Sequence, residues 1–345
     1  MSVMQQACSY KPHMRVGDQS YPAYELKNLI GYLKLYFSHE LVEQLYTDIG
    51  IGEAELMLSQ HVYVWQVDYA MSYIRNLTQD AEVAAKAASA YKVNDLEPLL
   101  PHLAQFKTLG ECLQFAVSHP ELVGSFSDTL LRNNDGCLHV RWLNTNRVDI
   151  ERYSCQFQHS VCSLLAFAKE LTGEAISVSH LALAEPYREA KFLTAQSGTE
   201  IVFDAEFFEW SIEHRYLALP ITFEFVAEQG ERCIDNSRSY IAELLAILRQ
   251  QAPALPNMEE MAGLQNISAR TLRRRLAAAN TSYQKLVDQV RCQMAIDLIL
   301  TSDYSIDEIS DLMGFGDVSH FRQSFKHWIG HPPGHFHRLN RPLTN

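Results

Sequence analysis

MEEMAGLQNISARTLRRRL (Met258–Leu276) and IDEISDLMGFGDVSHFRQSF (Ile306–Phe325) decide the fold of this chain, because they repeat one helical unit. Met258 corresponds to Ile306, which lies 48 residues further along the chain. Each stretch begins with a short acidic helix that has an apolar face. A turn and a second helix follow, so the sequence predicts two helix-turn-helix units.

The turn and cap residues of the two units differ in identity but share their chemistry. Asn266 and Gly314 tolerate the left-handed backbone conformation at which a helix commonly ends. Ser268 and Asp317 can each accept a hydrogen bond at the start of the second helix. That second helix places an apolar pair four residues apart, which leaves its other face polar. The pairs are Leu272 with Leu276, and Phe321 with Phe325.

The polar faces of the second helices carry side chains that suit DNA. Arginine can pair bidentately with guanine and glutamine with adenine, whereas serine contacts a base edge or a phosphate. A solvated basic face is the simpler alternative, but four arginines within six residues argue against it. We expect DNA contacts from Arg270, Arg273, Arg274, Ser319, Arg322, Gln323 and Lys326.

Between the two units, SYQKLVDQVRCQMAIDLIL (Ser282–Leu300) has apolar residues at helical spacing. A helix of this length spans about 28 Å, and one turn of B-DNA spans about 34 Å. A rigid helix here could therefore hold both second helices in successive major grooves of one duplex.

Residues 256–338 resemble the DNA-binding domain of the AraC/XylS family of bacterial transcription regulators. The matching positions are Arg291, Ala295, Leu298, Ser305–Ile309, Gly314, Phe315, Ser319, Phe321, Phe325, Lys326, Trp328, Gly330 and Pro333. Pro332 and Gln265 depart from the family pattern. The resemblance adds Val318 to the expected base contacts. It also implies regulation of transcription, with activation as the expected mode and promoter DNA and RNA polymerase as partners.

Composition restricts where DNA could bind. The net charge is −12, yet residues 251–345 hold 10 Lys and Arg against 9 Asp and Glu, whereas residues 1–250 hold 19 against 32. DNA binding must therefore depend on clustered arginines rather than on the charge of the whole chain. Seven scattered cysteines, no secretory signal and no long apolar run predict a reduced cytoplasmic protein without a membrane span.

The first 250 residues predict an α+β domain. Glu25–Phe37, Ala81–Tyr91 and a segment that ends at Pro120 have helical composition. Strands are expected over 137–144, 176–184 and 200–208, with an amphipathic helix over 155–173. The predicted fold is a helical subdomain and a β-α-β-β unit, followed by the all-α domain. A jelly-roll barrel is the alternative, although it needs more strands.

The predicted boundaries are a flexible tail over 1–20, a sensing domain over 21–249, a linker over 250–256 and the DNA-binding domain over 257–340. Two prolines in QQAPALP (Gln250–Pro256) indicate the linker. The apolar helix Tyr240–Leu248 just before it could form the seam of a homodimer, or it could pack on its own domain.

His180–Leu193 and Thr199–Trp210 resemble the arabinose-binding type of N-terminal sensing domain, which is found in AraC-type regulators of ornithine use and related regulators. The resemblance implies a small-molecule effector, by family analogy a carboxylated metabolite or a fatty acid. The residues expected to hold its carboxylate are Arg141, His180, Tyr187, Arg188 and Lys191. For each of them, a surface or strand-edge role is the alternative.

We found no sequence motif for catalysis, a cofactor or a metal. HExxH, GxSxG and phosphate-binding glycine loops are absent, and Pro332 and Pro333 interrupt the only helical histidine spacing, His327, His331 and His335. The sequence therefore predicts an effector-controlled transcription regulator. An enzyme over 20–250 that uses DNA for localisation is the rival hypothesis, and an architectural DNA protein is a third.

Overall fold

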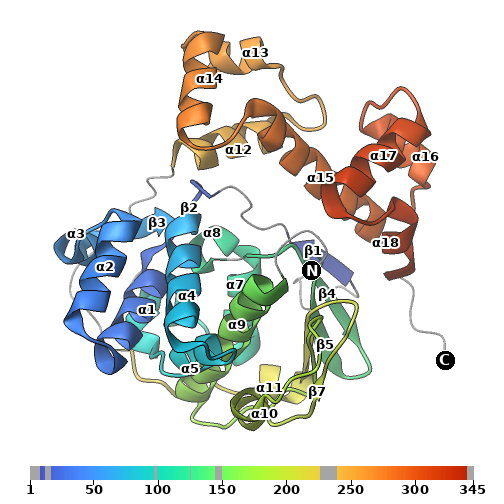
Figure 1. Ribbon diagram of the computed structural model, residues 1–345. Helices are drawn as coiled ribbons and strands as arrows, with labels where there is room; N and C mark the ends of the chain where they lie inside the picture. The colour runs from blue at the N-terminus through green and yellow to red at the C-terminus, as the bar shows by residue number, and fades with distance from the viewer. Residues whose placement is uncertain are drawn as a thin grey trace.

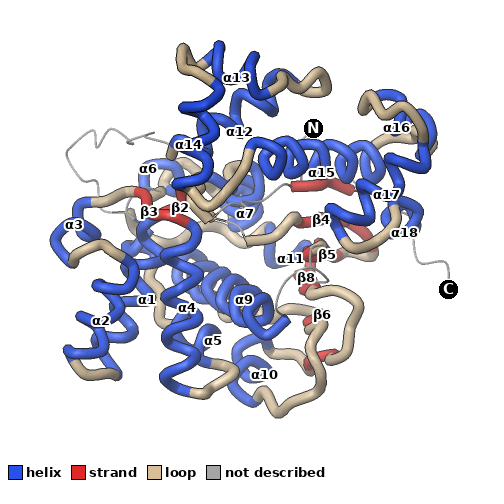
Figure 2. Tube along the Cα trace, turned by 45° about the horizontal axis from the view of Figure 1, so that its top comes forward, coloured by secondary structure: helices blue, strands red, loops and turns tan. Residues whose placement is uncertain are grey.

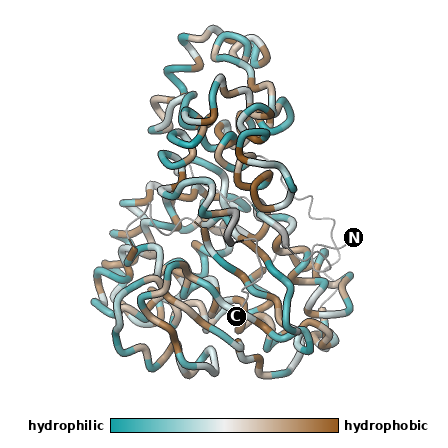
Figure 3. The backbone as a smooth tube through the Cα atoms, turned by 90° about the vertical axis from the view of Figure 1, so that its right-hand side faces the viewer, coloured by the Kyte–Doolittle hydropathy of each residue, from teal (hydrophilic) through white to brown (hydrophobic). Residues whose placement is uncertain are grey.

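The computed structural model describes residues 8–11, 17–96, 99–124, 126–143, 150–225 and 239–339. We call residues 8–225 the N-terminal half and residues 239–339 the C-terminal half. Figure 1 shows the helical C-terminal half standing on a mixed α and β N-terminal half. Figure 3 shows, from another side, a narrow C-terminal half above a broader base. The predicted fold class is confirmed.

The C-terminal half holds the two predicted helix-turn-helix units at the two ends of one long helix (Figure 1). The first unit comprises α13 and α14, the second comprises α16 and α17, and α15 connects them. The bounds are α12 Tyr240–Gln251, α13 Met258–Leu264, α14 Ala269–Ala278, α15 Tyr283–Thr301, α16 Ile306–Leu312, α17 Val318–Ile329 and α18 Pro333–Leu339.

The local chemistry of both units is as the sequence predicts. The Ser268 side chain accepts a hydrogen bond from the backbone of Thr271, and the Asp317 side chain does the same for His320. Asn266 and Gly314 have φ angles of 53° and 73°. A residue in the left-handed backbone conformation therefore follows the first helix of each unit, and a side-chain cap begins the second.

Helix α12 packs into the C-terminal half, whereas the predicted boundary after residue 249 places most of it in the sensing domain. Ile241, Leu244, Leu245 and Leu248 are buried in one core with Leu272 and Leu276 of α14 and with Leu286 of α15. The prolines that suggested a boundary follow α12, but the apolar face of α12 is covered by the first helix-turn-helix unit. A homodimer would therefore need another surface.

Among its described residues, the N-terminal half is built on a six-stranded sheet in the order β1-β4-β5-β8-β6-β7, in which only the β6–β7 pair is parallel. Strands β2 and β3 form a separate pair. The bounds are β1 Cys8–Lys11, β2 Ser20–Pro22, β3 His61–Tyr63, β4 Thr129–Asn134, β5 Cys137–Trp142, β6 His180–Ala182, β7 Ile201–Val202 and β8 Glu209–Glu213.

Strand β1 departs from the predicted flexible tail over residues 1–20. Its four residues pair with β4, and Tyr10 is buried. The partners of β1 lie more than a hundred residues away in the sequence, so no local pattern could reveal this strand. The rest of the predicted tail up to residue 16 lies outside the described residues.

Helices of the N-terminal half pack beside the sheet and form a second core (Figure 2). Helix α9 packs on the face of the sheet formed by Leu138, Trp142 and Trp210. The bounds are α1 Ala23–Tyr36, α2 His39–Ile49, α3 Glu53–Leu58, α4 Val64–Thr78, α5 Val83–Ala88, η2 Val93–Leu96, α6 Leu100–Leu103, α7 Leu109–Ser118, α8 Pro120–Val123, α9 Ile150–Thr172, α10 Lys191–Ser197 and α11 His214–Leu217.

The two halves share a continuous apolar core. Ile296 and Ile299 of α15 lie in one cluster with Tyr10 of β1, Leu130 of β4 and Phe207, and Figure 2 shows α15 lying over β1 and β4. Within the described ranges, no helix combines the length and the apolar character needed to cross a membrane.

We predict that Leu244→Ala destabilises the C-terminal half without changing the oligomeric state. The side chain is fully buried, and truncation of such a leucine costs about 2–5 kcal/mol. Urea unfolding followed by circular dichroism measures the loss, and sedimentation velocity measures the oligomeric state. Gln250→Ala, on the exposed face of the same helix, is the control. A variant that unfolds normally but dissociates from a dimer would contradict this prediction.

Candidate functional site

The residues predicted to bind DNA lie on the outer faces of α14 and α17. Seven of the eight are exposed, and Val318 is half-buried at the start of α17. The opposite faces are anchored by Leu272 and Leu276 in α14 and by Phe321 and Phe325 in α17, which are all fully buried. The structure therefore places the predicted DNA-binding residues on two helices at opposite ends of α15 (Figure 1).

Several basic side chains of this surface have contacts within the chain. The Arg322 guanidinium lies 3.5 Å from a carboxylate oxygen of Asp307 in α16. Arg273 lies 3.6 Å from the sulfur of Met258. Arg275, which was not expected to read bases, stacks over the Tyr240 ring of α12 at 5.1 Å. These contacts are exposed and weak, so DNA phosphates or bases can replace them.

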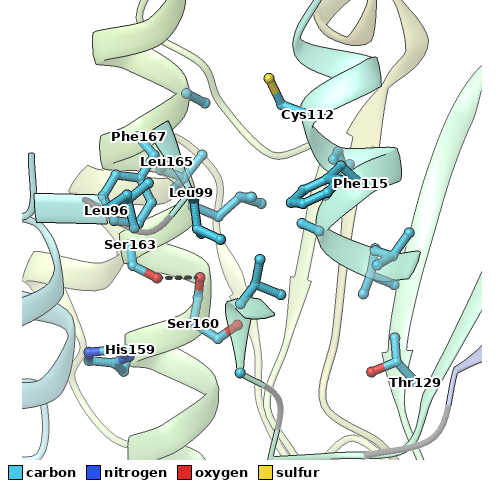
Figure 4. A pocket seen from close by; sticks show the side chains of 18 of the residues that line it. Leu96, Leu99, Cys112, Phe115, Thr129, His159, Ser160, Ser163, Leu165 and Phe167 are labelled. Atoms are coloured by element: carbon cyan, nitrogen blue, oxygen red, sulfur yellow. Dashed lines mark hydrogen bonds between the residues drawn. The ribbon is translucent and has the colours of Figure 1, made fainter. Parts of the chain in front are cut away.

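A cavity of about 230 Å³ lies in the N-terminal half, between the sheet and the helices α1, α7 and α9. We call it the effector cavity, because the sequence predicts an effector site in this half. Figure 4 shows the side chains of α9, such as Ser163 and Phe167, facing Cys112 and Phe115 of α7 across it. Leucines from η2, α6, α7 and α9 supply much of the remaining wall, and such apolar lining is typical of small-molecule sites.

Glu25 of α1 is the acidic side chain that lines the effector cavity. It is only 9% exposed, and one carboxylate oxygen accepts a hydrogen bond of 2.8 Å from the hydroxyl group of Tyr21. Burial raises the pKa of the carboxyl group to about 7, and the Tyr21 hydrogen bond offsets only part of that effect. Its charge state therefore changes near neutral pH.

His159 of α9 lines the same cavity and pairs with Tyr91. Its Nε2 atom and the Tyr91 hydroxyl share a hydrogen bond of 2.6 Å. Burial lowers the pKa of His159 to about 3, so the imidazole is neutral at physiological pH. The polar part of the cavity wall thus contains phenols, a neutral imidazole, hydroxyl groups, the amide of Gln156, one carboxyl group and the ammonium group of Lys11.

The two faces of the sheet contact different parts of the molecule, because side chains alternate along a strand. Lys11 of β1 and Thr129 of β4 line the effector cavity. Their neighbours Tyr10 and Leu130 point to the other face and pack in the core that contains α15. The same strands therefore separate the effector cavity from the C-terminal half.

The five residues predicted to hold an effector carboxylate lie outside the walls of the effector cavity. Arg141 pairs with Glu209, and His180 is in register with Ser211 of β8. Arg188 pairs with Glu185, and Lys191 pairs with Glu189 at the surface. Tyr187 is 78% exposed and contacts Phe203. The structure does not bring these five side chains together, and an effector role for them remains a prediction.

Glu25 is not among the cavity residues expected from the sequence, although the sequence contains a signal that it is buried. Glu25 precedes Leu29 by four residues in α1, so both belong to one helical face. A carboxylate on an otherwise apolar helical face is unusual, because burying it costs free energy unless it is paired. Arg141 was expected from its charge alone, whereas strand alternation places it on the face opposite to Val140 and Trp142, which line the cavity.

A second, polar cavity of about 310 Å³ lies between α4 and the start of α9. Its charged side chains are paired with each other, Arg75 with Glu151 and Arg152 with Asp68.

No group of three potential metal ligands occurs among the described residues. His331 stacks on His335 with ring centroids 4.5 Å apart, and His335 contacts Glu206 of the N-terminal half at 3.0 Å.

Comparisons with known proteins agree with this division into two halves. A family model described as the arabinose-binding domain of AraC transcription regulators, N-terminal, matches residues 42–221. A helix-turn-helix domain model matches residues 261–339. The first covers more than half of the chain.

Individual relatives are more distant. The ornithine utilization regulator of Pseudomonas aeruginosa is 25% identical over 238 residues, which cover 66% of this chain and 70% of that protein. The transcriptional regulator VqsM of the same species is 37% identical over 75 residues, or 22% of this chain and 23% of VqsM. The crystal structure of the P. aeruginosa regulator CdpR aligns with a TM-score of 0.42 at 17% identity, covering 91% of this chain and 98% of CdpR.

We predict that Arg273→Ala and Arg322→Ala each weaken binding to the preferred duplex by about 1–3 kcal/mol and relax base choice at one position. Fluorescence anisotropy on a duplex selected from a random-sequence pool measures the loss. Lys169→Ala removes the same charge from the exposed face of α9 and is the control. Equal weakening on all duplexes would assign the arginines to phosphates.

We predict that Glu25→Gln stabilises the protein more at pH 8 than at pH 5. A carboxyl pKa raised from 4.5 to about 7 makes the wild type lose stability as pH rises through that interval, because the folded state resists ionisation. The gain in the free energy of unfolding should be larger at pH 8 by about 2–3 kcal/mol. Urea unfolding at both pH values measures it, with the exposed Glu40→Gln as control. Equal gains at both values would mean that the pKa is ordinary.

Proposed function

The chain belongs to the AraC family of transcription regulators, and we propose that a small molecule in the effector cavity controls its hold on promoter DNA. It combines a helix-turn-helix DNA-binding half with a ligand-binding domain of the family type. The proposed switch acts in one chain and in the cytoplasm, with the effector bound in the N-terminal half and the DNA bound by α14 and α17.

The proposed DNA complex places α14 and α17 in successive major grooves. Nineteen residues of α15 span about 28 Å, which is close to the ~34 Å of one DNA turn. Both helices carry their basic faces outward, so a single chain would read a long site without two-fold symmetry. Activation through contact with RNA polymerase is the mode that we propose.

The observation that carries the proposed control is the shared position of β1 and β4. One face of these strands lines the effector cavity through Lys11 and Thr129. The other face packs on α15 through Tyr10 and Leu130. A ligand that moves the strands must also change their packing on α15, because close-packed cores do not deform without cost.

A buried polar contact strengthens the link between the halves. The Gln293 side chain of α15 donates a hydrogen bond of 3.4 Å to Asp128 at the start of β4, and it accepts one of 3.2 Å from Arg249 of α12. Asp128 is fully buried, and Gln293 is 5% exposed. Separation of the halves would leave both groups to find new partners, so the contact favours one docking geometry.

The family analogy implied a carboxylated metabolite or a fatty acid as effector. Lys11 would be the side chain to meet such a carboxylate, since it lines the effector cavity. Asp297 of α15 already attracts the Lys11 ammonium and raises its pKa, whereas burial lowers that pKa and is the larger effect. A carboxylate at Lys11 would therefore compete directly with a contact between the halves.

An enzymatic role for the N-terminal half is the alternative function. The named relatives are transcription regulators, and we propose that this chain likewise binds its ligand without turnover. Conversion of a bound compound into a product by the purified protein would favour the alternative.

We predict that the protein carries or takes up a ligand that Ala168→Phe excludes. Ala168 lines the effector cavity, so a phenyl ring there projects into it and narrows the space for a ligand. Native mass spectrometry of the full-length protein should show a surplus mass that is lost on denaturation, and anisotropy should show that Ala168→Phe still binds DNA but no longer responds to the ligand. Ala166→Phe, on the same helix but outside the cavity wall, is the control. A response that survives Ala168→Phe would place the effector elsewhere.

A further inference from the structure

We propose that the effector cavity takes a ligand with an apolar body and one protonated amine, and that Glu25 is the counter-charge of that amine. This inference rests on the proposed function, because it gives a chemical class to the proposed effector. It departs from the carboxylated ligand that the family analogy implied.

Glu25 has an oxygen left for a ligand. One oxygen of its carboxylate accepts the hydrogen bond of 2.8 Å from Tyr21. The other has no hydrogen-bond partner among the described residues, although the side chain is more than nine-tenths buried and lines the cavity. A buried carboxylate normally has a cation or several donors around it. The second oxygen of Glu25 is open to the cavity, so its donor must come from the cavity, as water or as a ligand.

The groups closest to Glu25 are neutral near pH 7, and Lys11, which lines the same cavity, does not shift the pKa of Glu25. The neutral groups are Tyr21 of β2, Tyr24 of α1 and, more distant, Tyr91, whose phenols have raised pKa values because of burial. His159 of α9 is neutral because burial lowers its pKa. Only burial and the Tyr21 hydrogen bond shift the pKa of Glu25, so no cationic side chain of the described chain compensates this carboxylate.

The position of the carboxylate is fixed by its surroundings. Gly124 has a φ of 76°, and a Cβ atom at this residue would lie 2.5 Å from the Tyr21 hydroxyl. The Tyr24 hydroxyl donates a hydrogen bond of 2.7 Å to the carbonyl oxygen of Val123. Contacts with the chain around α8 therefore hold the Tyr21 and Tyr24 side chains in position. The hydrogen bond from Tyr21 in turn orients the Glu25 carboxylate.

An amine fits this site better than an alcohol or an acid. A protonated amine supplies both charge and donors, and a charge-assisted hydrogen bond in an apolar site is stronger than a neutral one. An alcohol supplies one donor and no charge. A carboxylate would repel Glu25. The rest of the ligand must be apolar, because Leu99, Leu103 and Leu165 line the cavity.

Three compounds of eight carbon atoms each separate these classes: octylamine, 1-octanol and octanoate. Isothermal titration on the full-length protein at pH 8 should give the tightest binding to octylamine. Glu25→Gln should weaken octylamine binding by about 10- to 100-fold, the range for a buried charge-assisted bond, and change 1-octanol binding by less than about threefold. The exposed Glu40→Gln should change neither.

The pH profile of the wild type is an independent readout. An alkyl amine stays protonated from pH 5 to 8, since such groups titrate near ~10.4. Octylamine affinity should therefore fall about tenfold per pH unit below the pKa of Glu25, where the carboxyl group takes up a proton, and it should level off above that pKa. The affinity of 1-octanol should stay constant.

Several results would overturn the assignment. These are tighter binding of octanoate than of octylamine, no octylamine binding up to its solubility limit, or an octylamine affinity that is flat from pH 5 to 8. The last test needs no variant, so a Glu25→Gln protein that fails to fold leaves it intact. If the amine class fails while Ala168→Phe still abolishes the response to the natural ligand, the proposed function stands. If octylamine binds at Glu25 but no cavity ligand changes DNA affinity, the ligand class stands and the control mechanism fails.

Discussion

The burial of α15 is the constraint on which the arrangement of the whole molecule depends. This helix completes the first helix-turn-helix core through Leu286 and Val290, and the second through Ile296 and Ile299. It also contacts the sheet of the N-terminal half along β1. A helix with neighbours on several sides loses its amphipathic pattern, which explains why its apolar residues follow no single stripe. Because α14 and α17 are packed on opposite ends of it, neither can change its position relative to the other without unpacking α15.

The sheet connects the effector cavity of the N-terminal half directly to α15. Alternation along β1 and β4 places cavity residues and interface residues next to each other in the sequence, Lys11 beside Tyr10 and Thr129 beside Leu130. Coupling between ligand and DNA then requires no long chain of contacts, only a difference in how the two strands pack on α15. Its size is limited by the difference in ligand affinity between the two packings. A ligand that binds both equally would change nothing, however tightly it binds.

Local signals in the sequence were sufficient for both helix-turn-helix units, although not for the placement of α12 in the C-terminal half. Caps such as Ser268 and Asp317, and left-handed residues such as Asn266 and Gly314, act within a few residues of their own position, so the sequence alone revealed both units. The N-terminal half depends on pairings across long separations. Strand β1 pairs with β4, and β8 lies between β5 and β6, and neither arrangement has a local signature. For the same reason charge suggested Arg141 as a ligand residue, whereas its strand register turns it toward Glu209 and away from the cavity.

Among the buried acids of the N-terminal half, Glu25 differs in what surrounds it. Asp68 pairs with Arg152 and accepts a hydrogen bond from Gln156, and Glu185 pairs with Arg188. Asp128 accepts a hydrogen bond from Gln293 across the interface. Each of these carboxylates therefore stabilises a particular packing of chain segments. Within the described residues, Glu25 has only the hydrogen bond from the Tyr21 phenol, which offsets part of the free-energy cost of its burial. Natural sequences break local rules chiefly where function requires it, and a carboxylate that weakens the free protein can strengthen the complex with a cation. The unfavourable burial of Glu25 therefore supports a cationic ligand. A bound hydrogen-bond donor would stabilise the carboxylate, and the site would then favour ligands that carry such a donor.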